Sequence, residues 1–345
     1  FRYSQMMQNL AENVVQFITG GPSYARDTPP LDLDLFPDVV LQEIFKRADY
    51  PTLRNLKKVN HRFQALLSDP LLWISMCLEA GRTLPPLAFR RSLASFRLEE
   101  IEENYGESPE IDYERVYAKD PFRPNLAPPL LASIQQMKDE YGWKFDHTGY
   151  GSQMEVVDLE GEEPVRRCIV TSHSWGKRLV EINLVKEGVP EWILDHVRPR
   201  IVVSEWTRPR HDCASIYKMY AQLLKEHELF DTRVVLPRFK VAEKEWPQWT
   251  HTDFEKVELV FEDYPIGMRS IAILSQGKDQ QFWAGFYGAR FGNLEVRIEL
   301  PDDVRWLTAE MFTEPEKSLN NDEPPFMRHR NVVGRRFGGI FGRFH

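Results

Sequence analysis

Apolar residues between positions 31 and 81 recur every three or four residues, which is the spacing of helices that pack on a common core. Pro37 suits the first turn of a helix, where a backbone N–H has no intrahelical partner. The apolar face that follows it consists of Val40, Leu41, Ile44 and Phe45. The pattern therefore predicts a first helix that starts at Pro37 and buries this face.

Two further helices are expected in the same segment. Thr52 is a suitable N-cap for the second, whose apolar positions are Leu53, Leu56, Val59, Phe63, Leu66 and Leu67. Asp69 and Pro70 indicate the start of a third helix, which ends at Gly81. Three short helices form a marginal core alone, and residues 33–45 are more apolar than that core requires. A protein partner that covers the surplus is the natural expectation.

From about residue 140 the pattern changes to the two-residue period of strands. In the last of them Val296, Ile298 and Leu300 alternate with charged residues. Residues 277–279 indicate a turn, residues 190–197 one or two helical turns, and residues 215–224 fit either a strand or a helix. Further strands are predicted at residues 154–159, 166–172, 179–184, 200–206, 255–262 and 268–275. Many strands with few helices predict an antiparallel sandwich.

Four aromatic residues lie within six positions after the predicted turn, at Phe282, Trp283, Phe286 and Tyr287. Neighbouring glycines let the backbone bend and present a ring to solvent. Exposed rings stack on flat apolar faces, including those of sugars. The alternative is that these rings fill the core of the sandwich.

Composition narrows the function classes. The chain has 345 residues, which favours about two domains, and its net charge of −8 argues against general affinity for nucleic acid. No apolar run approaches the ~18 residues that a membrane helix needs. Three scattered cysteines do not form a disulfide framework and fit a reducing compartment. We therefore expect a cytoplasmic protein that is not inserted in a membrane.

Candidate chemistry is sparse. His173 together with residues 211–213 (His-Asp-Cys) lacks the paired-ligand spacing of a structural zinc site. Neither a nucleophilic triad motif nor a glycine-rich phosphate loop is present. We expect no metal, no cofactor and no catalytic residue. The paired carboxylates of a glycoside hydrolase remain open, because they depend on spacing in three dimensions.

The helical segment resembles the F-box. The matching residues, in order and at the family's spacing, are Phe36, Pro37, Asp38, Ile44, Phe45, Leu53, Leu56, Val59, Phe63, Leu66 and Trp73. Phe36 departs from the leucine usual at its position. The resemblance implies docking onto the Skp-type adaptor of a cullin-based ubiquitin ligase. The implied adaptor contacts are Leu35, Phe36, Pro37, Val40, Ile44 and, from the second helix, Leu56.

The strand-rich part resembles the F-box-associated domain of the sugar-recognising F-box proteins. It does so through Gly142, Trp143, Trp175, Trp192, Pro199, Ile201, Val202, Val203, Trp206, Asp212, Asp263, Tyr264, Gly267, Arg269, Gly277, Asp279, Trp283, Gly285, Gly288, Arg290, Asn293 and Val296. The resemblance implies a jelly-roll-like β-sandwich and hence an α+β multidomain chain. The expected divisions are an extension at 1–30, an F-box at 31–81, a helical linker at 82–139, the sandwich at 140–301 and a basic, glycine-rich tail at 302–345.

In glycan-binding members of this family, a small pocket holds the inner sugars of an N-linked high-mannose glycan. The family's pocket positions fall on His173, Asp212, Phe282, Trp283 and Ala284. Trp283 and Asp212 keep the family's residue types for stacking and for accepting hydrogen bonds. His173 replaces phenylalanine, Phe282 replaces tyrosine, and Ala284 replaces lysine, so two polar groups are lost.

The expected function is that of a substrate receptor in an SCF-type ubiquitin ligase, with an adaptor and a cullin scaffold as partners. The substrate class stays open between N-linked high-mannose glycoproteins, misfolded and exported from the endoplasmic reticulum, and a non-glycan protein surface. A carbohydrate-active enzyme is the third alternative.

Overall fold

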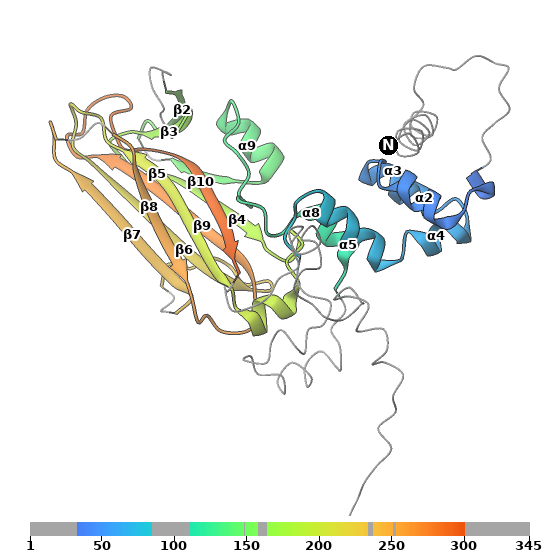
Figure 1. Ribbon diagram of the computed structural model, residues 1–345. Coiled ribbons are helices and arrows are strands. Elements are labelled where there is room, and N and C mark those ends of the chain that lie inside the picture. The colour runs from blue at the N-terminus through green and yellow to red at the C-terminus, as the bar shows by residue number, and fades with distance from the viewer. Residues whose placement is uncertain are drawn as a thin grey trace, which may run out of the picture.

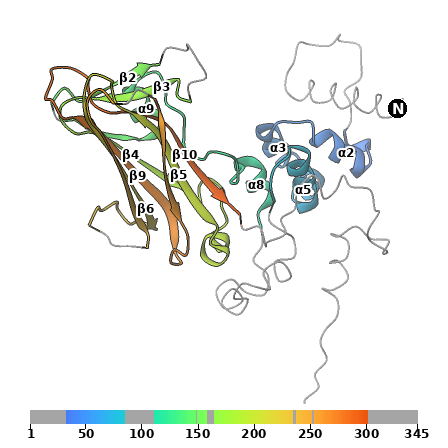
Figure 2. The ribbon, with the colours of Figure 1, turned by 60° about the vertical axis from the view of Figure 1, so that its left-hand side comes forward.

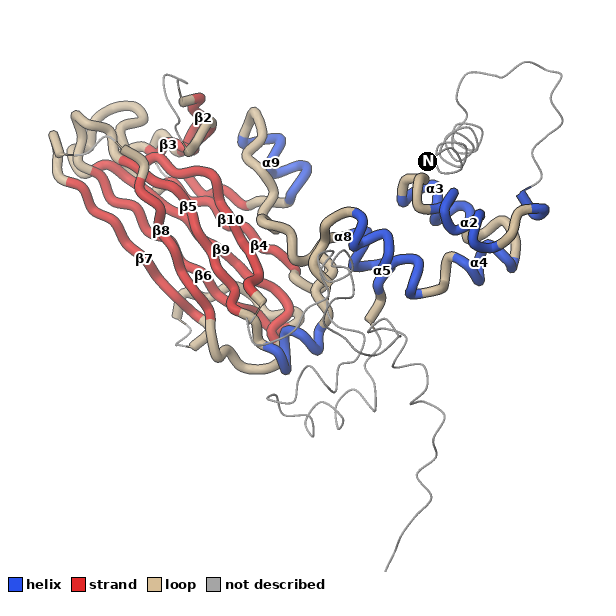
Figure 3. Tube along the Cα trace, viewed as in Figure 1, coloured by secondary structure: helices blue, strands red, loops and turns tan. Residues whose placement is uncertain are grey.

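The computed structural model describes residues 33–84, 111–147, 149–157, 164–233, 237–250 and 253–300. Helices gather at the N-terminal side and a β-sandwich follows, as Figures 1 and 3 show. This confirms the predicted order of helices followed by an antiparallel sandwich. The extension at 1–30, the helical connector at 87–104 and the tail at 302–345 lie outside the described residues.

Four α-helices follow a short 3-10 turn, Leu33–Leu35, in the N-terminal unit. They are α2 Asp38–Phe45, α3 Tyr50–Leu56, α4 His61–Leu66 and α5 Pro70–Glu79. The predicted second helix is thus two helices, because the Asn60 side chain accepts a hydrogen bond from Phe63 N at 2.7 Å and starts α4 anew. The prediction that Thr52 is the N-cap of this segment is wrong. Asp49 caps α3, and its side chain accepts a hydrogen bond from Thr52 N. Asp69 caps α5 as expected.

The sandwich consists of two antiparallel five-stranded sheets. In spatial order the first is β1 (Lys144–His147), β4 (Gly176–Asn183), β9 (Met268–Asp279), β6 (Ser215–Lys225) and β7 (Phe239–Trp246). The second is β2 (Ser152–Val156), β3 (Arg167–Thr171), β10 (Arg290–Glu299), β5 (Arg200–Arg208) and β8 (Glu255–Phe261). Figure 2 shows the two layers edge-on. Alternate residues of both inner faces form one apolar core.

One local prediction is wrong, one open alternative is decided, and one expected helical segment is found. Residues 277–279 are not a turn, because β9 continues through them and Gly277 pairs with Tyr217 of β6. Residues 215–224 are strand rather than helix. A short π-helix, Ile193–Val197, occupies the segment where helical turns were expected. The pattern did not predict β1, β7, α8 (Tyr113–Lys119) or α9 (Ile134–Tyr141).

The segment between the two units is anchored to both. Helix α8 packs on α5, and Tyr113 and Val116 belong to the helical core. On the other side Arg123 forms a 2.7 Å ion pair with Glu187, in the turn after β4. Ile111 packs against both cores. Figures 1 and 2 both place α8 between the helices and the sandwich.

The chain then reaches the sandwich, where residues 125–127 form hydrogen bonds with β10. Leu126 N donates to Val296 O at 2.7 Å, and the Asn125 side chain bonds to both Leu294 O and Val296 N. Leu126 is buried in the sandwich core. Residues 125–127 are therefore part of the sandwich, although they precede its first strand. None of the described helices is long and apolar enough to cross a bilayer.

Candidate functional site

Loops at one end of the sandwich converge because backbone hydrogen bonds join them. Asp279 N donates to Ser172 O at 3.0 Å, and Gly288 N donates to Thr171 O at 2.8 Å. Gln280 N donates to Ala214 O at 2.9 Å. These bonds bring together the loop after β3, the β5–β6 loop and the β9–β10 loop, at the upper end of the sandwich in Figure 1. We call residues 149–150, 172–174, 210–214, 247–250 and 280–288 the loop cluster.

One part of the loop cluster is a group of three rings around His173. The Tyr150 ring meets His173 edge-on at 5.4 Å between centroids, and Phe282 lies 6.4 Å away on a tilted plane. Phe282 is 74% exposed and has φ of +59°, an uncommon value for a residue with a side chain. Its N–H is held by the buried Asp279 carboxylate at 2.7 Å. The His173 Nδ1 atom is buried without a hydrogen-bond partner among the described residues.

A second part links Trp283 to Asp212 through Tyr287, which belongs to the predicted aromatic cluster, and Arg210, which the sequence pattern did not select. Trp283 meets Tyr287 edge-on at 5.3 Å, and the Arg210 guanidinium lies over the Tyr287 ring at 4.4 Å. Arg210 then holds both oxygens of Asp212, at 2.8 and 3.0 Å. The hydrogen bond from Arg210 lowers the pKa of Asp212 below its ordinary value, so the carboxylate stays charged at neutral pH.

A third part of the loop cluster, around Trp249, extends it beyond Asp212. Trp249 is 61% exposed at a φ of +66°, and it meets His211 edge-on at 5.3 Å. Trp249 N donates to His211 O at 2.8 Å, and Gln248 Nε2 donates to Asp212 O at 2.7 Å. The backbone of Asp212 therefore positions this loop while its side chain faces Arg210.

The structure thus brings the five predicted site residues to one end of the sandwich in two groups. His173 contacts Phe282, and Asp212 reaches Trp283 through Arg210 and Tyr287. Ala284 is exposed and contributes only a methyl group. The sequence pattern selected Tyr287 in the aromatic cluster, whereas Tyr150, Arg210 and Trp249 were missed. Of these three, only Arg210, two residues from Asp212, lies near a predicted site residue in sequence. No group of metal-ligating side chains occurs in the described ranges.

Two family descriptions match the chain. The F-box associated region matches residues 117–298, which is more than half of the chain, and an F-box-like segment matches residues 33–79. The chain belongs to the F-box proteins with an F-box associated region. F-box only protein 6 of Bos taurus is 30% identical over 276 residues, covering 78% of this chain and 93% of the relative. F-box only protein 17 of Homo sapiens is 26% identical, covering 79% and 94%.

Among solved structures, the carbohydrate-binding module TmCBM61 in complex with beta-1,4-galactotriose aligns with 50% of this chain and 100% of its own. The sequence identity is 9% and the TM-score 0.30.

The F-box places its six predicted adaptor contacts in different environments. Leu35 is 81% exposed, Pro37 is exposed, and Phe36 and Val40 are half-buried. Ile44 and Leu56 are buried in the core of the F-box itself. Val39 and Val59, which were not selected, are 70% and 64% exposed. An apolar surface thus remains along the first turn of α2 and its flanks.

Proposed function

We propose that the chain is the substrate-recognition subunit of an SCF-type ubiquitin ligase in the cytosol. In this proposal the F-box binds a Skp-type adaptor, which connects it to a cullin scaffold. The loop cluster binds the substrate. The observation that carries the proposal is a pair of solvent-exposed aromatic residues, Phe282 and Trp283, in the same loop cluster as an ion-paired carboxylate, on a chain that has an F-box. The protein itself is a binding subunit, and its partners perform ubiquitin transfer.

The substrate class that we propose is a protein carrying an N-linked high-mannose glycan. Trp283 offers an apolar face on which a pyranose ring can stack. Asp212 is charged and can accept hydrogen bonds from hydroxyl or acetamide groups. Arg210, beside it, carries N–H donors that offset the donor lost where Ala284 replaces lysine. Such glycoproteins reach the cytosol when they are misfolded and exported from the endoplasmic reticulum.

The test is binding of the full chain, purified with its adaptor, to an array of N-linked glycans. We expect high-mannose glycans to bind and Trp283→Ala to remove binding. Leu229→Ala is the control and should leave binding unchanged, because it removes an exposed apolar side chain of the sandwich outside the loop cluster. Absence of binding by a folded complex would contradict the glycan assignment and leave the ligase assignment standing.

A non-glycan protein surface is the second candidate, favoured by the apolar character of the 282–284 loop. Phe282 is 74% exposed and lacks a hydroxyl, and Ala284 adds no polar group. Such a loop suits an unfolded or hydrophobic protein segment. Capture of one unfolded protein with and without its glycan separates the two candidates. Equal capture, reduced by Phe282→Ser, would favour the protein surface.

The adaptor interaction has its own test. Leu35→Asp combined with Val39→Asp changes two exposed side chains without entering the F-box core. We expect this variant to lose adaptor co-purification. Val156→Asp, which alters an equally exposed valine on the sandwich, should retain it. Adaptor binding unchanged by the first variant would contradict the proposed docking surface.

The assignment as a non-catalytic subunit has a separate test. Glycans are incubated with the complex and then analysed by chromatography. Any turnover of the glycans would favour an enzyme.

A further inference from the structure

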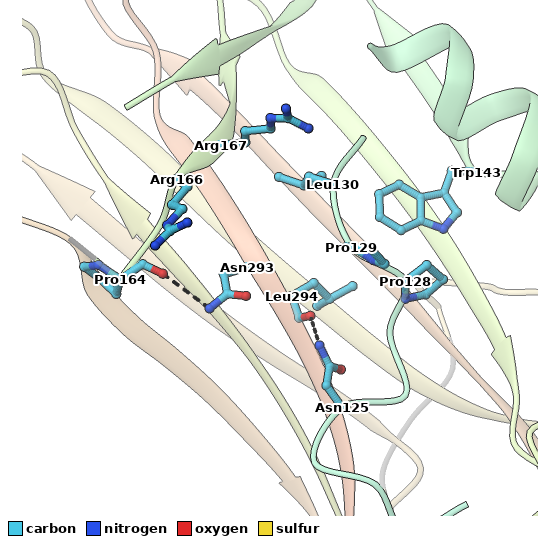
Figure 4. A pocket seen from close by; sticks show the side chains of 10 residues that line it. All are labelled: Asn125, Pro128, Pro129, Leu130, Trp143, Pro164, Arg166, Arg167, Asn293 and Leu294. Atoms are coloured by element: carbon cyan, nitrogen blue, oxygen red, sulfur yellow. Dashed lines mark hydrogen bonds between the residues drawn. The ribbon is translucent and has the colours of Figure 1, made fainter. Parts of the chain in front are cut away.

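A cleft of about 510 Å³ lies on the sandwich, away from the loop cluster. Strand β10 pairs with β3 only at Arg290 and Phe291, and its pairing with β5 is irregular between Gly292 and Glu295. Segment 125–127 takes over the free edge of β10 further along. The gap between the start of β3 and this segment is the cleft shown in Figure 4. Its volume is within the range of ligand-binding pockets.

The two walls of the cleft differ in chemistry. Arg166 and Arg167 line one wall, and both are exposed. Neither side chain has a hydrogen bond or ion pair within the parts of the chain that the structure describes. The opposite wall is apolar and carries Pro128, Leu130 and the edge of Trp143. Figure 4 shows the arginines on one side of β10 and these apolar side chains on the other.

One hydrogen bond holds the backbone beside each wall of the cleft. Asn293 Nδ2 donates to Pro164 O at 3.4 Å, beside the basic wall. Asn125 Nδ2 donates to Leu294 O at 3.0 Å, beside the apolar wall. Asn293 has a φ of +51°, which an asparagine tolerates better than most residues. The cleft is therefore built from backbone that is held in place on both sides.

We propose that this cleft binds an extended peptide in which acidic and apolar residues alternate. Successive side chains of an extended peptide point to opposite sides at ~3.3 Å per residue, so one set faces the arginines and the other the apolar wall. Unpaired guanidinium groups bind carboxylates through charge-assisted hydrogen bonds. A free anion would use only the basic wall. The cleft lies at the start of β3 and the loop cluster lies at its end. Peptide binding in the cleft is therefore independent of glycan binding by the loop cluster.

The probe is a fluorescein-labelled decapeptide of alternating glutamate and valine, added to the full chain in complex with its adaptor and followed by fluorescence anisotropy. We expect Arg166→Glu with Arg167→Glu to weaken binding by about tenfold or more, because two charge-assisted contacts become repulsive. Lys225→Glu with Arg233→Glu is the matched control. It reverses two exposed positive charges, one at the last residue of β6 and one in the loop that follows β6. It should leave the affinity unchanged. Unfolding temperatures should confirm that both variants fold.

Three results would overturn the proposal. The first is equal binding of a peptide of the same composition with glutamates and valines in separate blocks, displaced by inorganic phosphate, which would mean that the cleft takes only anions. The second is unchanged affinity in Leu130→Gln, which makes the apolar wall polar. The third is binding that appears only after Asp158, Glu160, Glu162 and Glu163 are changed to their amides. That result would assign the cleft to this chain's own acidic segment.

Discussion

Arg178 of β4 and Glu205 of β5 form an ion pair between the two sheets, with 2.9 Å between Nη1 and Oε1, and neither side chain is exposed to solvent. The second carboxylate oxygen accepts from the Tyr217 hydroxyl at 2.7 Å and from the Ser275 hydroxyl at 2.5 Å. Burial, followed by the charge of Glu205, raises the pKa of Tyr217 well above its usual value, so the phenol remains a donor. The aromatic rings of Trp143 and Phe291 flank the guanidinium.

Removing one partner of this pair should destabilise the sandwich strongly. Glu205→Gln leaves the buried Arg178 charge without a counter-ion, and the loss expected for a broken buried pair is about 3–5 kcal/mol. Arg178→Met with Glu205→Leu should lose less than the sum of the single variants, because no charge is left unpaired. Urea denaturation followed by tryptophan fluorescence measures the parent, Glu205→Gln, Arg178→Met, Glu205→Leu and the double variant. Additive losses would show that the two residues do not act as a pair.

Asn125 should contribute more to the stability of the sandwich than its place in a connecting segment suggests. Its side chain accepts from Ala127 N and Val296 N and donates to Leu294 O. Asn125→Ala leaves the buried Val296 N–H unsatisfied, at a cost of about 2 kcal/mol or more. Asn125→Asp keeps both accepting contacts and should have an intermediate stability. The prediction is wrong if Asn125→Ala unfolds at the same urea concentration as the parent protein.

The cysteines should react slowly while the protein is folded. Burial raises the pKa of Cys77 and Cys168 to about 12 and that of Cys213 to about 11. At pH 8 roughly one thiol in a thousand or fewer is then ionised, and only the thiolate reacts. A disulfide reagent should modify the three cysteines over hours in buffer and at once in urea. Rapid labelling of one folded-state thiol would identify a local opening.

The Arg210–Asp212 pair predicts how pH affects the loop cluster. Because Arg210 lowers the pKa of Asp212, the pair stabilises the folded state above the carboxyl's ordinary value of 3.8 and is lost as pH falls through the lower folded value. The unfolding temperature of the parent should exceed that of Asp212→Asn by a constant amount above about pH 5. The difference should shrink at lower pH. A difference that grows on acidification would contradict this sign.

The sequence predicted the helical unit well because its signals are local. Asp69 and Pro70 begin α5 as expected, and three of the four predicted apolar positions of α2, Leu41, Ile44 and Phe45, are buried. The break between α3 and α4 was missed, since the apolar spacing runs through it and only the Asn60 cap marks it. In the sandwich, β9 passes through Gly277 because β6 and β4 pair with it on both sides. That pairing is tertiary and overrides a local turn signal.

The candidate site was predictable only as separate residues. Family resemblance selected Asp212 and Trp283, but the contacts that relate them run through Arg210 and Tyr287, which meet only when the β5–β6 and β9–β10 loops come together. Trp249 is exposed and its backbone adopts a positive φ, and no residue pattern indicates either feature. The cleft beside β10 arises from a strand irregularity and a connecting segment far apart in sequence. The two arginines of the cleft, Arg166 and Arg167, do not belong to a recognisable sequence motif.

Helix α8 is packed against both units. It packs on α5 at one side, and the Arg115 guanidinium donates to Val185 O in the sandwich at the other. Gly188 lies so close to Lys119 that an added Cβ would be 2.7 Å from the lysine Cβ. In the proposed ligase, a substrate held by the loop cluster would therefore be presented at one fixed orientation to the conjugating enzyme. Which substrate lysines receive ubiquitin would then depend on their position in space, and sequence around each lysine would matter little.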